Sequence, residues 1–180
     1  RARRFQPIQI PGRGKGRIDH DPLARQPVQS VRQLLGRLDP HIVAQPGGKL
    51  SALIMATGAP RWDVEVGISR GATELERVTD IGGAPVLFEN EVCAASYQGR
   101  VGCFDLVTGS ARWTRDLSSS VGVAVDQLFV FAPDDKGALN AFTRDTGASS
   151  WKNDKLSFRR LSTPLSYGRA VAVGDYEGYV

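Results

Sequence analysis

The sequence predicts an all-β fold, a β-propeller whose blades are four-stranded sheets. A unit made of glycine, apolar residues, a Thr-Gly pair and a tryptophan occurs three times, in Gly47–Trp62, Gln98–Trp113 and Lys136–Trp151. The three tryptophans are 51 and 38 positions apart, and the Thr-Gly pairs repeat both intervals. A period near 40 residues with several short strands in each unit is typical of propeller blades.

The apolar pattern within each unit predicts strands. In Arg100–Leu106 apolar side chains alternate at Val101 and Cys103, and a second alternation runs through Ala138–Phe142. A period of two predicts half-buried strands and excludes helical repeats of similar length. Each unit is expected to contain a strand, a glycine turn, a second strand, a Thr-Gly turn and a last strand that carries the tryptophan.

A basic lead-in precedes the repeats. Residues 1–30 hold four prolines and the run Pro11–Gly16 without an amphipathic period, which predicts an arm or linker that can be disordered. The glycine run lacks the lysine spacing of a phosphate loop, so attraction of its arginines to an anionic surface is the better hypothesis. Residues 1–37 carry a net charge of +7 within a chain total of +4, so the repeats themselves are slightly acidic.

Residues 31–180 are predicted to form a partial propeller of about four blades. The units end near Trp62, Trp113 and Trp151, and a fourth is cut off at Val180. A closed ring needs four to eight complete blades, so the chain is interpreted as a fragment of a longer ring. No run of apolar residues is long enough to span a membrane, and no signal region is recognisable.

The first unit is expected to be short. Fourteen positions separate the proline from the turn glycine in the second and fourth units, whereas Pro40 and Gly48 are eight positions apart. The missing six residues equal about one strand. The preceding Ser30–Arg37 is apolar enough to form a strand or a short helix that leads into the repeats.

An insertion in Gly67–Gly83 lengthens the first interval by 13 positions. Insertions in blades fall on rim loops, where binding sites concentrate. The polar candidates in this loop are Glu74, Glu76, Arg77 and Asp80. The alternative, an ordinary solvated loop, stays open.

Cys93 and Cys103 flank the turn around Gly99. A three-residue hairpin loop with Gly99 in the left-handed conformation places the two cysteines opposite each other on adjacent strands. Two interpretations stay open: a cross-strand disulfide in an oxidising compartment, or two small buried apolar residues. No metal site is expected, because there are no other cysteines and both histidines, His20 and His41, lie in or beside the lead-in.

The recurring tryptophans predict a structural role. Each is expected to pack between neighbouring blades, near a Thr-Gly turn. The threonines of those turns are expected to bond the backbone, and their glycines to take positive φ. These glycines are Gly58, Gly109 and Gly147.

The repeat pattern resembles the quinoprotein-type, PQQ- or WD40-like propellers, and three segments resemble one branch of them, the BamB family. Members of this family are lipoproteins of the outer-membrane β-barrel assembly machinery. The segments contain the Glu-Leu-Glu-Arg and Gly-Asp-Tyr-Glu-Gly-Tyr motifs, and they are Arg70–Val86, Ala94–Gly109 and Phe158–Val180. The resemblance covers about residues 31–180.

The resemblance implies a non-enzymatic scaffold subunit, an eight-bladed propeller on the periplasmic face of the outer membrane of a Gram-negative bacterium. It implies an N-terminal lipid anchor that this chain lacks, no cofactor and no nucleic acid. The implied partners are the periplasmic POTRA domains of the barrel-forming subunit BamA, with unfolded outer-membrane proteins as a further candidate.

In the family, a Leu-x-Leu-Arg segment and an Asp-x-Asp segment form the partner surface. Carried over, the first falls on Gln33, Leu34 and Leu35, and the second on Asp80 with Arg77 nearby. The fit is partial. Leu35 stands in place of the arginine, and Gly82 stands in place of the second aspartate.

Two other functions compete with this prediction. A PQQ-dependent quinoprotein dehydrogenase needs metal-binding carboxylates at the ring centre and usually adjacent cysteines, whereas Cys93 and Cys103 are ten positions apart. A generic interaction propeller with another partner is the second alternative.

Overall fold

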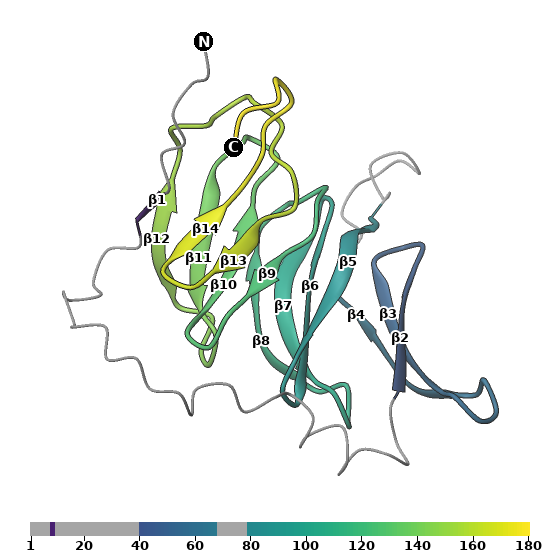
Figure 1. Cartoon of the computed structure of the whole chain (residues 1–180). Coiled ribbons are helices and arrows are strands. Elements are labelled where there is room, and N and C mark those ends of the chain that lie inside the picture. The colour runs from purple at the N-terminus through teal and green to yellow at the C-terminus, as the bar shows by residue number, and fades with distance from the viewer. Residues whose placement is uncertain (1–7, 10–39, 68–78) are drawn as a thin grey trace, which may run out of the picture.

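The computed structural model describes residues 8–9, 40–67 and 79–180. The described residues form antiparallel sheets and contain no helix, so no helix there is long and apolar enough to cross a membrane. The predicted all-β propeller fold is confirmed: the sheets lie face to face in chain order, as the change of colour across Figure 1 shows.

Two sheets are complete four-stranded meanders. The second sheet has the order β5-β6-β7-β8, with bounds Ile81–Phe88, Glu91–Ser96, Arg100–Asp105 and Ala111–Asp116. The third has the order β12-β11-β10-β9, with bounds Ser149–Asn153, Leu139–Thr143, Phe129–Pro133 and Ala124–Val125. Both sheets have the predicted order of elements: a strand, a glycine turn, a second strand, a Thr-Gly turn and a strand that carries the tryptophan.

The first and fourth sheets are three-stranded within the described part of the chain. The first contains β2, β3 and β4, with bounds Pro40–Gln45, Lys49–Ile54 and Pro60–Glu65. The fourth contains β13 and β14, with bounds Leu165–Tyr167 and Ala170–Ala172, and β1, Ile8–Gln9, pairs with the free edge of β14. The lead-in helix or strand expected over Ser30–Arg37 lies outside the described residues.

The expectation of half-buried strands is wrong for the inner strands. Every residue of β6 is buried, and the four central residues of β7 are buried as well. The alternation is real, but successive side chains point into two different cores. Val92 and Phe104 pack toward the first sheet, whereas Val101 packs toward the third. Because the second sheet lies between two neighbours, neither face of β6 or of the centre of β7 meets water.

The tryptophans join the sheets as expected. The Trp62 ring lies against Gly109 of the next sheet, where an added Cβ would be 2.7 Å from the ring, and its Nε1–H donates to the Leu106 carbonyl over 3.1 Å. Trp113 repeats the arrangement one sheet later, against Gly147 and with the Arg144 carbonyl as acceptor. Trp62 and Trp113 therefore each clamp their sheet to the next Thr-Gly turn.

The Thr-Gly turns have the predicted conformation. Their glycines have φ between 64° and 73°, and each threonine hydroxyl accepts the N–H two residues later. The turn around Gly99 differs from the prediction, because Gln98 takes the left-handed conformation with φ of 52°. Gly99 is required for close approach: a Cβ there would lie 2.1 Å from the Ser96 hydroxyl and 2.8 Å from Gly67 Cα.

Candidate protein-interaction surface

One end of the stacked sheets carries a repeated arrangement that we call the connector rim. It consists of Asp80, Ser118 and Arg159, which lie in the connectors that lead into the second, third and fourth sheets. Each of their carbonyls accepts an N–H from the turn that follows the second strand of the same sheet, over 2.8 to 3.1 Å, from Tyr97, Asp135 and Tyr176 respectively. The connectors are thus fixed in one register around this end.

Asp80 is the described member of the predicted partner surface. Its carboxylate is exposed at the rim, and Oδ1 accepts the Gly47 N–H of the first sheet over 3.1 Å. Its carbonyl accepts the Tyr97 N–H over 2.8 Å. The side chain therefore sits where the first and second sheets meet, held by backbone on both sides.

Gly82 departs from the Asp-x-Asp pattern for a steric reason. An added Cβ would lie 2.6 Å from the Ser119 carbonyl oxygen and 2.8 Å from the Ser120 carbonyl carbon, both backbone atoms of the adjoining connector. Real Cβ atoms do not approach backbone so closely, so a side chain at position 82 would displace the third sheet. The glycine keeps β5 packed against this connector and removes one carboxylate from the predicted partner surface.

The remaining predicted partner residues, Gln33, Leu34, Leu35 and Arg77, lie outside the described residues, as do Glu74 and Glu76 of the insertion. Their membership of the surface stays a prediction.

Cys93 and Cys103 face each other in register on β6 and β7, and a disulfide joins them. Both are fully buried in the core between the second and third sheets, beside Trp113. The bond therefore reinforces the sheet interior and is not part of an exposed redox site.

A buried ion cluster lies beside this disulfide. The Glu91 carboxylate, whose side chain is 3% exposed, contacts Arg112 of its own sheet at 3.2 Å and Arg144 of the third sheet at 3.4 Å. Burial raises the pKa of Glu91, and the two guanidinium groups oppose that rise. Arg144 also lies over the Phe88 ring, at 4.7 Å from its centroid. The cluster bonds the second sheet to the third.

Among the described residues, the one group of three potential metal ligands is Glu91 with Cys93 and Cys103. The disulfide removes both thiolates, and Glu91 is paired with arginine. This arrangement does not suit a metal ion.

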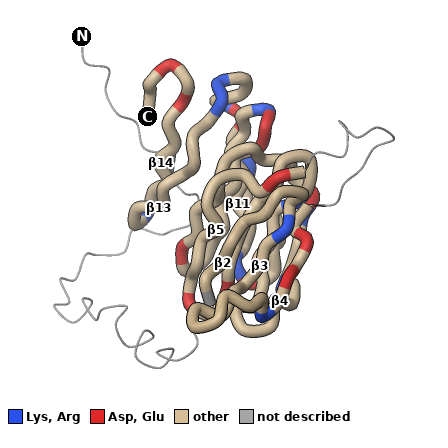
Figure 2. The backbone as a smooth tube through the Cα atoms, turned by 90° about the vertical axis from the view of Figure 1, so that its right-hand side faces the viewer, with Lys and Arg blue, Asp and Glu red and all other residues tan. Residues whose placement is uncertain are grey.

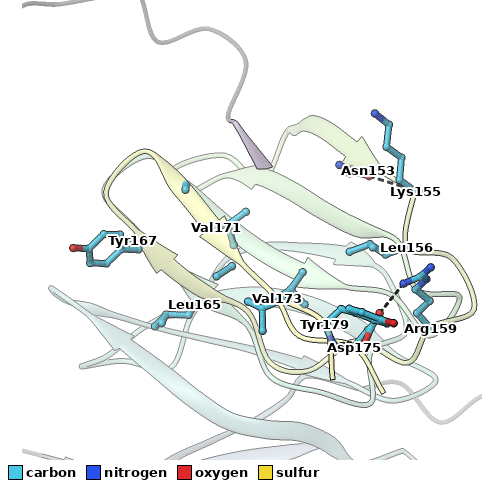
Figure 3. A pocket seen from close by; sticks show the side chains of 13 residues that line it. Asn153, Lys155, Leu156, Arg159, Leu165, Tyr167, Val171, Val173, Asp175 and Tyr179 are labelled. Carbon is cyan, nitrogen blue, oxygen red and sulfur yellow. Dashed lines mark hydrogen bonds and ion pairs between the residues drawn. The ribbon is translucent and has the colours of Figure 1, made fainter. Parts of the chain in front are cut away.

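An apolar groove of about 640 Å³ lies along the fourth sheet (Figure 3). Tyr167 and Leu165 lie at one end, and the Arg159–Asp175 ion pair of 2.9 Å lies at the other. In the second sheet, β6 is the equivalent of β14, and the corresponding edge of β6 pairs with a third strand, β7. The groove therefore has the lining of a sheet interior and lacks the convergent polar groups of a ligand site.

Charges of both signs are interspersed along the described residues. Figure 2 shows acidic and basic residues close together in the turns and along β4, while β2 and β5 carry none. This mixture of charges in the described residues is compatible with a protein partner.

Comparisons with known proteins decide the family. The family model described as "Outer membrane protein assembly factor BamB" matches residues 15–153. The chain belongs to the BamB family.

Relatives from two organisms agree with this membership. BamB of Bordetella pertussis is 46% identical over 136 residues, which are 75% of this chain and 35% of that protein. BamB of Escherichia coli is 32% identical over 139 residues, 77% of this chain and 36% of that protein. The chain thus spans about a third of the length of these curated relatives.

Solved structures agree in fold. BamB from Moraxella catarrhalis superposes with a TM-score of 0.70 at 35% identity, over 77% of this chain and 42% of that one. A quinohemoprotein alcohol dehydrogenase from Comamonas testosteroni superposes with a TM-score of 0.50 at 19% identity, over 63% of this chain and 19% of that one. The dehydrogenase shares the fold alone, so the BamB family and not the enzyme is the chain's own branch.

Sequence reasoning missed two features of the connectors and sheets. Glu91 and Arg144 are 53 positions apart, and no spacing rule predicts their contact across two sheets. Phe158 is 91% exposed in the connector of the fourth sheet, whereas an apolar residue next to a strand is ordinarily assigned to the core. The one available signal was its place in the repeat, six positions before a proline, as Leu34 is.

Proposed function

We propose that this chain is part of a non-enzymatic scaffold subunit that binds the periplasmic POTRA domains of BamA at the periplasmic face of the outer membrane. The connector rim is the contact surface in this proposal. Asp80 supplies a carboxylate there, and Gln33, Leu34, Leu35 and Arg77 complete the surface.

The exposed carboxylate of Asp80 is the observation that carries the proposal. The carboxylate accepts the Gly47 N–H, and the backbone carbonyl of Asp80 accepts the Tyr97 N–H. Because both groups are held, little conformational entropy is lost when a partner binds this residue. A fixed charge beside apolar anchors suits a reversible protein contact. The family's name as an assembly factor agrees with a scaffold role.

We expect Asp80→Arg to weaken binding of purified BamA POTRA domains at least tenfold, because it reverses the charge at the centre of the contact. The melting temperature of the blades should change little, since the side chain is exposed. Isothermal titration calorimetry of the 180-residue chain against the POTRA domains measures the first quantity, and thermal unfolding measures the second.

Two further variants separate charge from local structure. Asp80→Asn keeps an acceptor for the Gly47 N–H and removes only the charge, so it should weaken binding less than Asp80→Arg. Asp145→Arg makes the same charge change at an 83% exposed side chain beside a Thr-Gly turn, at the opposite end of the sheets, and should leave the affinity unchanged. Equal affinity of the wild type and Asp80→Arg would show that Asp80 is not part of the contact.

A further inference from the structure

The connector of the fourth sheet displays an aromatic ring in an unusual backbone conformation. Phe158 is 91% exposed and has φ of 67°, and Arg160, two residues later, has φ of 49°. Bulky residues rarely adopt positive φ, and such outliers persist where the surrounding structure holds them, often at functional sites.

Hydrogen bonds hold this conformation in place. The Phe158 N–H donates to the Lys136 carbonyl over 2.9 Å, and the Arg159 N–H donates to the Leu156 carbonyl over 3.2 Å. The Arg159 guanidinium pairs with Asp175 at 2.9 Å, and Figure 3 shows it turned into the groove toward that carboxylate. The ring beside it is therefore presented by a fixed loop, with little freedom to lose on binding.

The adjoining turn prevents the connector from packing closer. An added Cβ on Gly137 would lie 2.8 Å from the Phe158 nitrogen and 3.1 Å from Ser157 Cα. Even with glycine there, the turn and the connector backbone are in close contact at this point, so no room remains between them for the phenyl ring.

The repeat makes the exposure of Phe158 informative. The carbonyls of Asp80 and Arg159 accept equivalent turn N–H groups, so Thr79 and Phe158 occupy the same position in two sheets. Thr79 is 2% exposed and packs toward Gly48 and Gly67, whereas Phe158 is turned out to solvent. Leu34 is six positions before Pro40, as Phe158 is six before Pro164. Phe158 thus repeats, three connectors further along the chain, the apolar anchor assigned to Leu34.

The connector segment that carries Phe158 is basic. Lys155 and Arg160 are exposed on the same connector, and Arg159 is neutralised by Asp175. Asp154 is the single acidic residue in 152–160. An aromatic side chain flanked by cations fits an apolar pocket edged with carboxylates.

We propose that Phe158 is a second anchor of the partner surface and inserts into an apolar pocket with an acidic edge on the POTRA domains. This inference rests on the proposed function and extends its surface along the connector rim from the second sheet to the fourth. Arg160 provides the cation that meets the edge of the pocket, and Arg159 acts only by positioning the loop.

Phe158→Ala is expected to weaken POTRA binding at least tenfold, with an unchanged melting temperature because the ring contacts little of its own protein. Phe158→Gly should weaken it to a similar degree. Glycine accepts the positive φ without strain, so the two variants together separate loss of the ring from a change of the loop. Calorimetric titration of the POTRA domains into each chain measures the affinities.

Tyr167→Ala is the matched control. Tyr167 is 80% exposed and lies at the other end of the groove (Figure 3), so its loss should not change the affinity. Wild-type affinity of both Phe158 variants would overturn this inference while the proposed function stands. An equal loss in Phe158→Ala and Tyr167→Ala would also overturn it, because it would indicate general aromatic adhesion. A wild-type chain that does not bind the POTRA domains would instead refute the proposed function.

Discussion

Replacing Trp113 with alanine is expected to lower the free energy of unfolding by about 3 to 5 kcal/mol, the largest effect of any single change considered. Trp113 is 6% exposed, lies 6.0 Å from Phe142 between ring centroids, and covers Gly147 of the next sheet. Its removal leaves a cavity between two sheets and deprives the Arg144 carbonyl of its donor. Urea unfolding followed by far-ultraviolet circular dichroism measures the loss.

Trp151→Ala is the comparison for this prediction. Trp151 occupies the equivalent position in the third sheet and lies 5.9 Å from Phe131, but it is half-buried. Within the described part of the chain its Nε1–H has no acceptor, so its removal breaks no such bond there. We expect less than half of the loss found for Trp113→Ala. Equal losses in the two variants would contradict the clamping role assigned to Trp113.

Glu91→Leu is expected to lower the free energy of unfolding by about 3 kcal/mol, because removal of the buried partner leaves one largely buried charge with only the exposed carboxylates of Glu89 and Asp145. That charge is Arg144, whose side chain is 16% exposed and whose Nε lies 3.4 Å from Glu91. The double change Glu91→Leu with Arg144→Met should recover most of the loss, since apolar residues of similar volume often replace a buried ion pair at little cost. Equilibrium urea unfolding of the single and double variants measures both values. A double variant as unstable as the single one would show that the loss comes from packing and not from charge.

The pH dependence of stability offers an independent test of the Glu91 site. Burial raises the pKa of Glu91 in the folded chain, so the folded state holds this proton more tightly than the unfolded state does. Its contribution to stability is therefore full below the unfolded pKa near 4.5 and is lost as the pH rises through the folded pKa. Asp105 and Asp134 have lowered pKa values and contribute in the opposite direction.

Comparison with Glu91→Gln isolates the contribution of Glu91 to the pH dependence of stability, because Gln does not titrate and the aspartates are common to both chains. The stability of the wild type relative to Glu91→Gln should fall as the pH is raised from below 4.5 toward neutrality. Unfolding free energies at several pH values give this difference. A difference that grows with pH would mean that the two arginines outweigh the burial of the carboxylate.

Features that depend on the repeat were accessible from the sequence. The spacing of Trp62, Trp113 and Trp151 predicted the blades and the packing against Thr-Gly turns, because each copy supports the same structural interpretation of the others. The strand register that places Cys93 opposite Cys103 followed from the loop length alone, and the structure pairs them so.

Features that depend on contacts between sheets were not accessible. The burial of both faces of β6 follows from the stacking of neighbouring sheets, which an alternating pattern in one strand does not reveal. The left-handed conformation falls on Gln98, whereas Gly99 permits the close approach of Gly67, a residue of the preceding connector. The outward turn of Phe158 likewise depends on the Lys136 carbonyl of the third sheet.

The most direct test of the scaffold proposal is a calorimetric titration of purified BamA POTRA domains into the wild-type 180-residue chain. We predict saturable binding with one POTRA segment per chain and a dissociation constant in the micromolar range or tighter, as expected for a small mixed surface with fixed anchors. Absence of binding by a chain that circular dichroism shows to be folded would contradict the account.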